Sequence, residues 1–98
     1  MKITKNLNGT NLTIALEGRL DTTTAPELEQ ALKESMDAAA ALTLDFSKLD
    51  YISSAGLRVL LSAHKAMAKK GGMKVVNVNE IVREVFDVTG FGDILTIE

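Results

Sequence analysis

The chain opens with two short stretches in which apolar and polar residues alternate. They cover Lys2 to Leu7 and Asn11 to Glu17, and a period of two residues predicts strands with one buried face. The pair Asn8-Gly9 lies between them, and Asn-Gly between alternating stretches is a strong signal for a two-residue hairpin. The chain is then predicted to turn over Gly18 to Asp21.

Helical spacing replaces the alternation after this turn. Thr24 and Glu27 have the spacing of a capping box, and Pro26 lies in the first turn, where its missing N–H is not needed. One face of the predicted helix is mainly apolar and consists of Leu28, Ala31, Leu32, Ser35, Met36 and Ala39.

The rest of the chain alternates between predicted strands and helices. A third strand contains Leu42, Leu44 and Phe46, and a polar loop follows it, with Asp45 at the strand end and Asp50 inside the loop. The remaining elements are a helix over Gly56 to Lys70 closed by Gly71-Gly72, a strand over Met73 to Val78, a helix over Glu80 to Val88 and a strand over Ile94 to Ile97. The third helix is capped by Asn79, ended by Gly90 and followed by Phe91, and its inward residues are Ile81, Val82, Val85 and Phe86.

Strands that alternate with helices predict parallel pairing with right-handed crossovers. The N-terminal hairpin adds an antiparallel edge, so we expect an α/β fold with a mixed sheet. Most strands alternate apolar with polar residues, which indicates that three main helices lie mostly on one sheet face and that the other face is largely solvated. With 98 residues, 46% of them hydrophobic, the chain suits one domain over 1–98.

Composition excludes several kinds of site. The chain has no cysteine and one histidine, so we expect no metal site and no disulfide. The net charge is −2 and aromatic residues are few, which argues against nucleic acid as a partner. The longest apolar run, Ala38 to Leu42, is far too short for a membrane helix, and no apolar signal region follows Met1. We therefore expect a cytoplasmic protein.

Two serines, Ser53 and Ser54, lie at the N-terminus of the second predicted helix. The first N–H groups of a helix lack intrahelical partners and the helix dipole adds partial positive charge, so a phosphate is favoured there. A phosphorylatable serine, Ser54, is the first hypothesis. The alternative is that Ser53 and Ser54 are ordinary N-cap residues.

Three motifs together resemble the STAS family, and specifically its single-domain anti-sigma-factor antagonists. They are Asp45-Phe46-Ser47 with Ser53-Ser54-Ala55-Gly56-Leu57, Gly18-Arg19-Leu20-Asp21 with Ala25-Pro26-Glu27-Leu28, and Val85-Phe86-Asp87-Val88-Thr89-Gly90-Phe91. The resemblance extends over essentially the whole chain.

The resemblance implies that Ser54 is the phosphoacceptor, with Ser53 as the fallback. The family motif Asp-Ser-Ser/Thr-Gly reads Ser53-Ser54-Ala55-Gly56 here. Ser53 therefore replaces the acidic residue of the motif, and Ala55 replaces its second hydroxyl residue. The implied partner surface consists of Asp21, Thr22, Asp50, Ser53, Ser54, Ala55, Gly56 and Arg58. Arg58, one turn after Ser54, could meet an acidic partner surface.

The resemblance also implies the mechanism. The unphosphorylated protein binds an anti-sigma factor that is also a serine kinase and so frees a sigma factor. Phosphorylation on Ser54 ends this binding, and a serine phosphatase restores it. The chain would then need no cofactor or catalytic residue and would not be an enzyme.

Three alternatives compete with this interpretation. A STAS subunit could be a permanent scaffold in a transport or signalling complex, without a phosphorylation switch. A receiver domain that uses Asp45 would need an acidic pair after its first strand, and this chain has none there. A hydrolase with Ser54 as nucleophile would need the Gly-x-Ser-x-Gly elbow, which the chain also lacks. His64 is expected to be a hydrogen-bonded residue at the boundary of the core, and Asp45 and Asp50 to be turn formers or caps.

Overall fold

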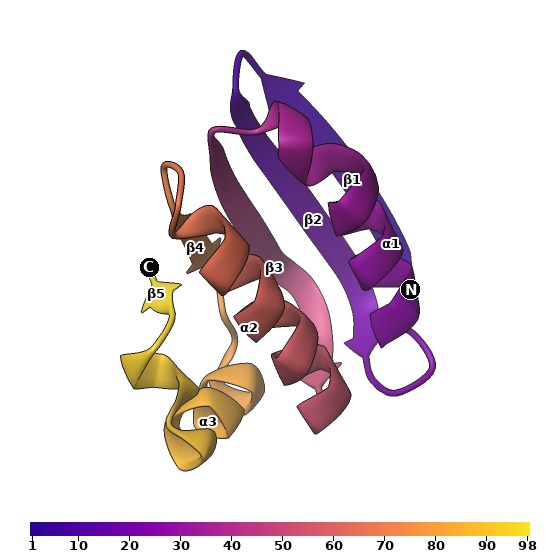
Figure 1. The fold of residues 1–98 in the computed structure, drawn as a ribbon. Coiled ribbons are helices and arrows are strands. Elements are labelled where there is room, and N and C mark those ends of the chain that lie inside the picture. The colour runs from indigo at the N-terminus through magenta and orange to yellow at the C-terminus, as the bar shows by residue number, and fades with distance from the viewer.

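Five strands form one mixed sheet in the computed structural model, which describes residues 1–98 (Figure 1). The strands are β1 (Lys2–Asn8), β2 (Asn11–Leu20), β3 (Ala41–Ile52), β4 (Met73–Val76) and β5 (Thr96–Ile97), and they are adjacent in that order. β1 pairs with β2 in antiparallel register, whereas every later pair is parallel. The predicted hairpin and mixed sheet are therefore confirmed.

Three helices connect the parallel strands and pack against one side of the sheet (Figure 1). They are α1 (Ala25–Ser35), α2 (Ser54–Met67) and α3 (Glu80–Thr89). Two short 3₁₀ turns, η1 (Met36–Ala38) and η2 (Phe91–Asp93), follow α1 and α3. None of these helices combines the length and apolarity needed to cross a membrane.

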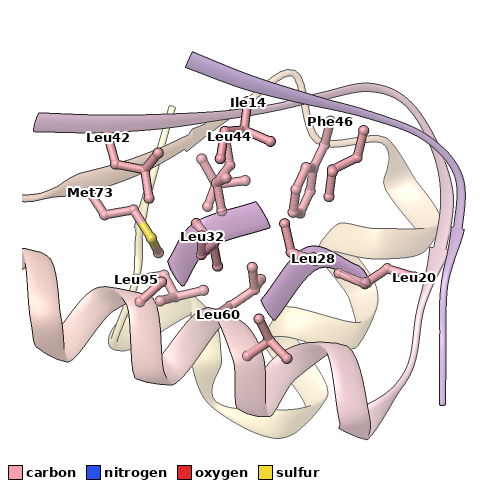
Figure 2. Close-up of a cluster of buried hydrophobic side chains, with 14 of the residues drawn as sticks. Ile14, Leu20, Leu28, Leu32, Leu42, Leu44, Phe46, Leu60, Met73 and Leu95 are labelled. Atoms are coloured by element: carbon pink, nitrogen blue, oxygen red, sulfur yellow. The ribbon is translucent and has the colours of Figure 1, made fainter. Parts of the chain in front are cut away.

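One hydrophobic core lies between the sheet and the helices. Figure 2 shows side chains of β2 and β3, including Ile14, Leu44 and Phe46, on the side of the sheet that carries the helices. Leu28 and Leu32 of α1 and Leu60 of α2 meet them there, and all of these residues are buried. No polar or charged residue is buried, so the apolar positions of the sequence account for the core.

β2 and β3 are longer than the alternation predicted. Gly18 to Leu20 form the end of β2, so the predicted turn over Gly18 to Asp21 is wrong at its start. The predicted loop after Phe46 is also wrong, because β3 continues to Ile52 beside β2. Two register shifts between these strands, together with a φ of +105° at Gly18, let the strands bend while pairing continues.

Several element ends also differ from the prediction. The capping box at α1 does not form: Thr24 makes no side-chain cap bond, and its hydroxyl lies 2.8 Å from the carbonyl oxygen of Arg19. The helix stops at Ser35. β4 ends at Val76 because Asn77 takes up a left-handed conformation with φ of 60°, and β5 begins only at Thr96.

The caps of α3 agree with the prediction, but one of its inward residues does not. The side chain of Asn79 accepts a hydrogen bond of 2.8 Å from the N–H of Val82, and Gly90 ends the helix with a φ of 81°. Val82 and Phe86 are buried, whereas Ile81 is 59% exposed, contrary to the prediction. Only one stripe of this short helix reaches the core.

Candidate functional site

The end of β3 and the start of α2 form the centre of the candidate site. Ser53 is the N-cap of α2, with an extended backbone, and Ser54 is the first residue of the helix. The helix therefore starts two residues earlier than predicted and ends at Met67 instead of Lys70. The N–H of Ser53 donates a hydrogen bond of 2.9 Å to the carbonyl oxygen of Leu20, which joins this junction to the end of β2.

The two candidate serines differ in their access to solvent. Ser54 is exposed, while the hydroxyl oxygen of Ser53 is shielded from solvent and has no hydrogen-bond partner. Ser53 also makes no side-chain cap bond to α2, so neither serine acts through its side chain as an ordinary N-cap. An enzyme that modifies a hydroxyl at this junction would reach Ser54 first.

Gly56 brings the first turn of α2 close to the sheet. A Cβ atom at this position would lie 2.7 Å from Cγ of Leu20 and 2.9 Å from Cγ1 of Ile52. These distances are shorter than real carbon contacts, so a side chain at this position would force either the helix or the side chains of Leu20 and Ile52 to move. Gly56 thus fixes the height of Ser54 above the sheet.

The turn between β2 and α1 lies at the same edge of the sheet as the start of α2 (Figure 1). Asp21 organises this turn: its carboxylate accepts hydrogen bonds from the hydroxyl of Thr23, at 2.8 Å, and from the N–H groups of Thr23 and Thr24. The Thr23 hydroxyl, helped by these N–H groups and opposed by desolvation, lowers the pKa of Asp21 below its ordinary value. Thr22 is exposed in the same turn.

A shallow hollow joins this turn to α2. The hollow contains Thr22, Ala55 and Arg58, so the fold brings together three of the residues that the sequence proposed. The other residues that line it are Ala25, Pro26, Glu29, Val59 and Ser62. Val59 and Ser62 line both this hollow and a neighbouring one that continues between α1 and α2. The sequence did not lead us to propose Val59 or Ser62 for the site. The i, i+4 spacing of Arg58 and Ser62, which puts both on one face of α2, is a signal that could have indicated Ser62.

Two further carboxylates lie within β3: Asp50 is in the strand and not in a loop as predicted, and Asp45 is in its middle and not at its end. Asp45 accepts hydrogen bonds from the side-chain amide of Asn77, at 3.0 Å, and from the N–H of Ser47, at 2.9 Å. The Asn77 amide, with the Ser47 N–H, lowers the pKa of Asp45 below its ordinary value, against a small effect of desolvation. Asp50 is exposed in the strand and does not line the hollow beside Arg58.

Arg19 and Tyr51 form a second contact at the ends of these strands that sequence reasoning missed. The guanidinium carbon of Arg19 lies 4.8 Å from the centroid of the Tyr51 ring, and its Nε lies 3.8 Å from a carboxylate oxygen of Asp21. Arg19 is thereby occupied by contacts within the chain.

The remaining candidates do not assemble into a reactive centre. His64 is half-buried as predicted, but its Nδ1 is buried without a hydrogen-bond partner, so the predicted hydrogen bond is absent. No cluster of three or more histidine, cysteine or carboxylate side chains is placed to hold a metal ion.

Comparison with known proteins gives the family. The model of the STAS domain family matches residues 2–98. The chain belongs to the STAS domain family. BtrV of Bordetella bronchiseptica, which carries the name anti-sigma factor antagonist, is 35% identical over 99 residues, covering 99% of this chain and 85% of BtrV. The anti-sigma-B factor antagonist of Bacillus subtilis is 31% identical over 91 residues, covering 92% of this STAS chain and 84% of the relative.

A solved structure agrees with both sequence matches. The anti-sigma factor antagonist from Mycobacterium paratuberculosis superimposes with a TM-score of 0.88 at 26% identity, over 98% of this chain and 83% of that one. The family resemblance inferred from the three motifs is therefore confirmed, as is the single small α/β fold with a mixed sheet and three helices.

Proposed function

We propose that this STAS protein is an anti-sigma factor antagonist whose binding is controlled by phosphorylation of Ser54. In the unmodified state it binds an anti-sigma factor and so releases a sigma factor. In the modified state it dissociates. This function is one of binding and regulation, without catalysis by this chain.

The exposed position of Ser54 at the start of α2 carries the proposal. Its hydroxyl is accessible, that of Ser53 is not, and the surrounding surface lies at one edge of the sheet. The names of the relatives support the partner class, since proteins similar over nearly the whole chain are called anti-sigma factor antagonists. The proposed partner surface is that formed by the β2–α1 turn and the first turns of α2.

Phosphorylation would act by changing charge at this surface. A kinase, which we take to be the anti-sigma factor itself, would transfer the terminal phosphoryl group of ATP to Oγ of Ser54, with loss of the hydroxyl proton and release of ADP. A phosphoserine carries about −1.5 to −2 charges at neutral pH. That charge is costly to desolvate inside an interface, so the partner dissociates, and a serine phosphatase would reverse the change.

Intact mass measurement tests the acceptor. After incubation with ATP and the anti-sigma factor kinase from the same genome, we expect the mass of the protein to rise by one phosphate. Ser54→Ala should abolish the increase, and Ser53→Ala, its matched control, should not. A phosphate recovered on Ser53, Ser47 or a threonine would contradict the assignment.

A permanent scaffold remains the second candidate, supported by the residues around Ser54. Ser53 and Ala55 stand where the family motif has an acidic residue and a second hydroxyl. A scaffold subunit would keep the same surface and bind through it without responding to phosphorylation.

A further inference from the structure

We propose that Arg58 has two alternative anionic partners: a carboxylate of the binding protein when Ser54 is free, and the phosphate of Ser54 when it is modified. The inference rests on the proposed function and adds a mechanism for the switch. Phosphorylation would not only add repulsive charge to the interface, but also remove a cation that the interface uses.

The first observation is that Arg58 has no anionic partner within the chain. Ion pairs join Lys5 to Glu34, Arg19 to Asp21, Lys33 to Glu29 and Lys74 to Glu98, and none involves Arg58. Arg58 is exposed, and it is the only charged residue in the first two turns of α2, residues 54–61. A guanidinium donates up to five hydrogen bonds, so Arg58 can bind an anion without breaking an ion pair within the chain.

The second observation is the relation between Arg58 and Ser54 on the helix. Both belong to α2 and are four residues apart, so their Cβ atoms are neighbours on one face, about 5 to 6 Å apart. Helical side chains lean toward the N-terminus, which directs Arg58 toward Ser54. An anion four residues before a cation is also the favourable order for such a pair.

The third observation concerns what Arg58 offers to a partner when Ser54 is free. Its side chain lines the hollow with Thr22, Ala55 and Val59, and Val59 is almost completely buried. Glu29 also lines the hollow, but its carboxylate is paired with Lys33 at 3.2 Å. A partner side chain with an apolar stem and an anionic end would match Val59 and the unpaired guanidinium of Arg58. A glutamate or aspartate of the anti-sigma factor has both features, with its carboxylate on the guanidinium.

The pairing inside the chain can be tested without any partner. Phosphoserine is introduced at position 54 during synthesis, and the second pKa of the phosphate, normally about 6, is followed by ³¹P NMR. A neighbouring cation stabilises the dianion, so we expect Arg58→Gln to raise this pKa by about 0.2 to 0.4 units. Lys65→Gln removes the same charge eleven residues from Ser54 and should leave the pKa nearly unchanged.

Two results of this titration would overturn the pairing. One is an unchanged pKa in Arg58→Gln, and the other is an equal shift in Arg58→Gln and Lys65→Gln, which would reduce the effect to net charge. Circular dichroism of each variant confirms that the fold is retained. Since position 54 is phosphorylated by synthesis, the result does not depend on whether a kinase uses this serine.

A double-mutant cycle tests the other half of the proposal. With the anti-sigma factor that binds the unmodified protein, Arg58→Gln should weaken binding about tenfold, as expected for the loss of a charge-assisted hydrogen bond. The further loss caused by phosphorylation should then be about tenfold smaller than in the wild type, because the phosphate no longer removes Arg58. An unchanged loss would overturn the exchange of partners, whereas a wild type that binds no anti-sigma factor would contradict the proposed function itself.

Discussion

At the scale of single residues, Gly56 sets the geometry of the site. The start of α2 approaches Leu20 and Ile52 so closely that a Cβ atom has no room. Glycine normally weakens a helix by about 1 kcal/mol relative to alanine, so its presence in the first turn requires a packing reason. The close approach to the ends of β2 and β3 supplies that reason.

We expect Gly56→Ala to destabilise the protein by about 1 to 3 kcal/mol, because overpacking outweighs the gain in helix propensity. Urea unfolding followed by circular dichroism measures the change. The pair Ser62→Gly and Ser62→Ala, at an exposed position of the same helix, reports the propensity difference alone and should favour alanine. A Gly56→Ala variant as stable as the wild type would show that α2 can move off the sheet without cost.

Asp45, also at the scale of a single residue, makes a pH-dependent contribution to the stability of the folded protein. Its carboxylate accepts bonds from Asn77 and Ser47, which lower its pKa in the folded protein. A lowered folded pKa contributes stability above the unfolded value of about 3.9, and the contribution is lost as the pH falls through the folded value. Asp45→Asn should therefore melt at a lower temperature than the wild type near neutral pH, and the difference should shrink below about pH 4. A difference that is constant with pH would assign the effect to packing.

At the scale of elements, Asn79 joins α3 to the part of β3 that extends beyond β4. Its Oδ1 accepts from the N–H of Val82 at 2.8 Å, and its Nδ2 donates to the carbonyl oxygen of Leu49 at 2.8 Å. The pairing of β3 with β4 ends at Asp45 and Val76, so β4 does not reach Leu49. The side chain of Asn79 supplies the carbonyl oxygen of Leu49 with the hydrogen bond that a neighbouring strand would otherwise donate.

Two substitutions separate the two roles of Asn79. Asn79→Ala loses the cap, at about 1 kcal/mol, and leaves a partly buried carbonyl without its donor, for a total of about 2 to 3 kcal/mol. Asn79→Asp keeps an acceptor for Val82 but cannot donate to Leu49, so its cost should be smaller than that of Asn79→Ala. Equal unfolding free energies for the wild type and Asn79→Asp would show that the bond to Leu49 is not needed.

At the scale of the whole molecule, the edge that gathers the β2–α1 turn and the start of α2 is the proposed partner surface. If Ser54 lies at its centre, Ser54→Asp adds charge inside an interface and should weaken binding to the anti-sigma factor by about 2 to 5 kcal/mol. Ser54→Ala should bind nearly as well as the wild type. Calorimetric titration measures both.

Arg83 provides the control for this experiment, since it is exposed on α3, outside the β2–α1 turn and the first turns of α2 that form the proposed surface. Arg83→Glu should change the affinity much less, because remote charges act mainly on the association rate. Equal affinities of Ser54→Asp and Ser54→Ala would favour the permanent scaffold over the phosphorylation switch.

The sequence by itself determined the class of fold and the family. Alternation with a period of two residues, the Asn8-Gly9 hairpin and the helical spacing of apolar residues are local signals, and they depend on a residue and its near neighbours. The cap of α3 at Asn79 and its end at Gly90 were predictable for the same reason. The motif around Ser54 was visible because its residues are consecutive.

Only the tertiary structure decided where β2 and β3 end and which residues share the site. Both strands continue through polar residues because each supplies the other's hydrogen bonds, and that pairing joins segments about thirty residues apart. The tight fit of Gly56, the buried hydroxyl of Ser53 and the hollow between Thr22 and Arg58 likewise depend on contacts between distant elements. Local propensity contains no information on such contacts, whereas packing of the elements around one core determines them.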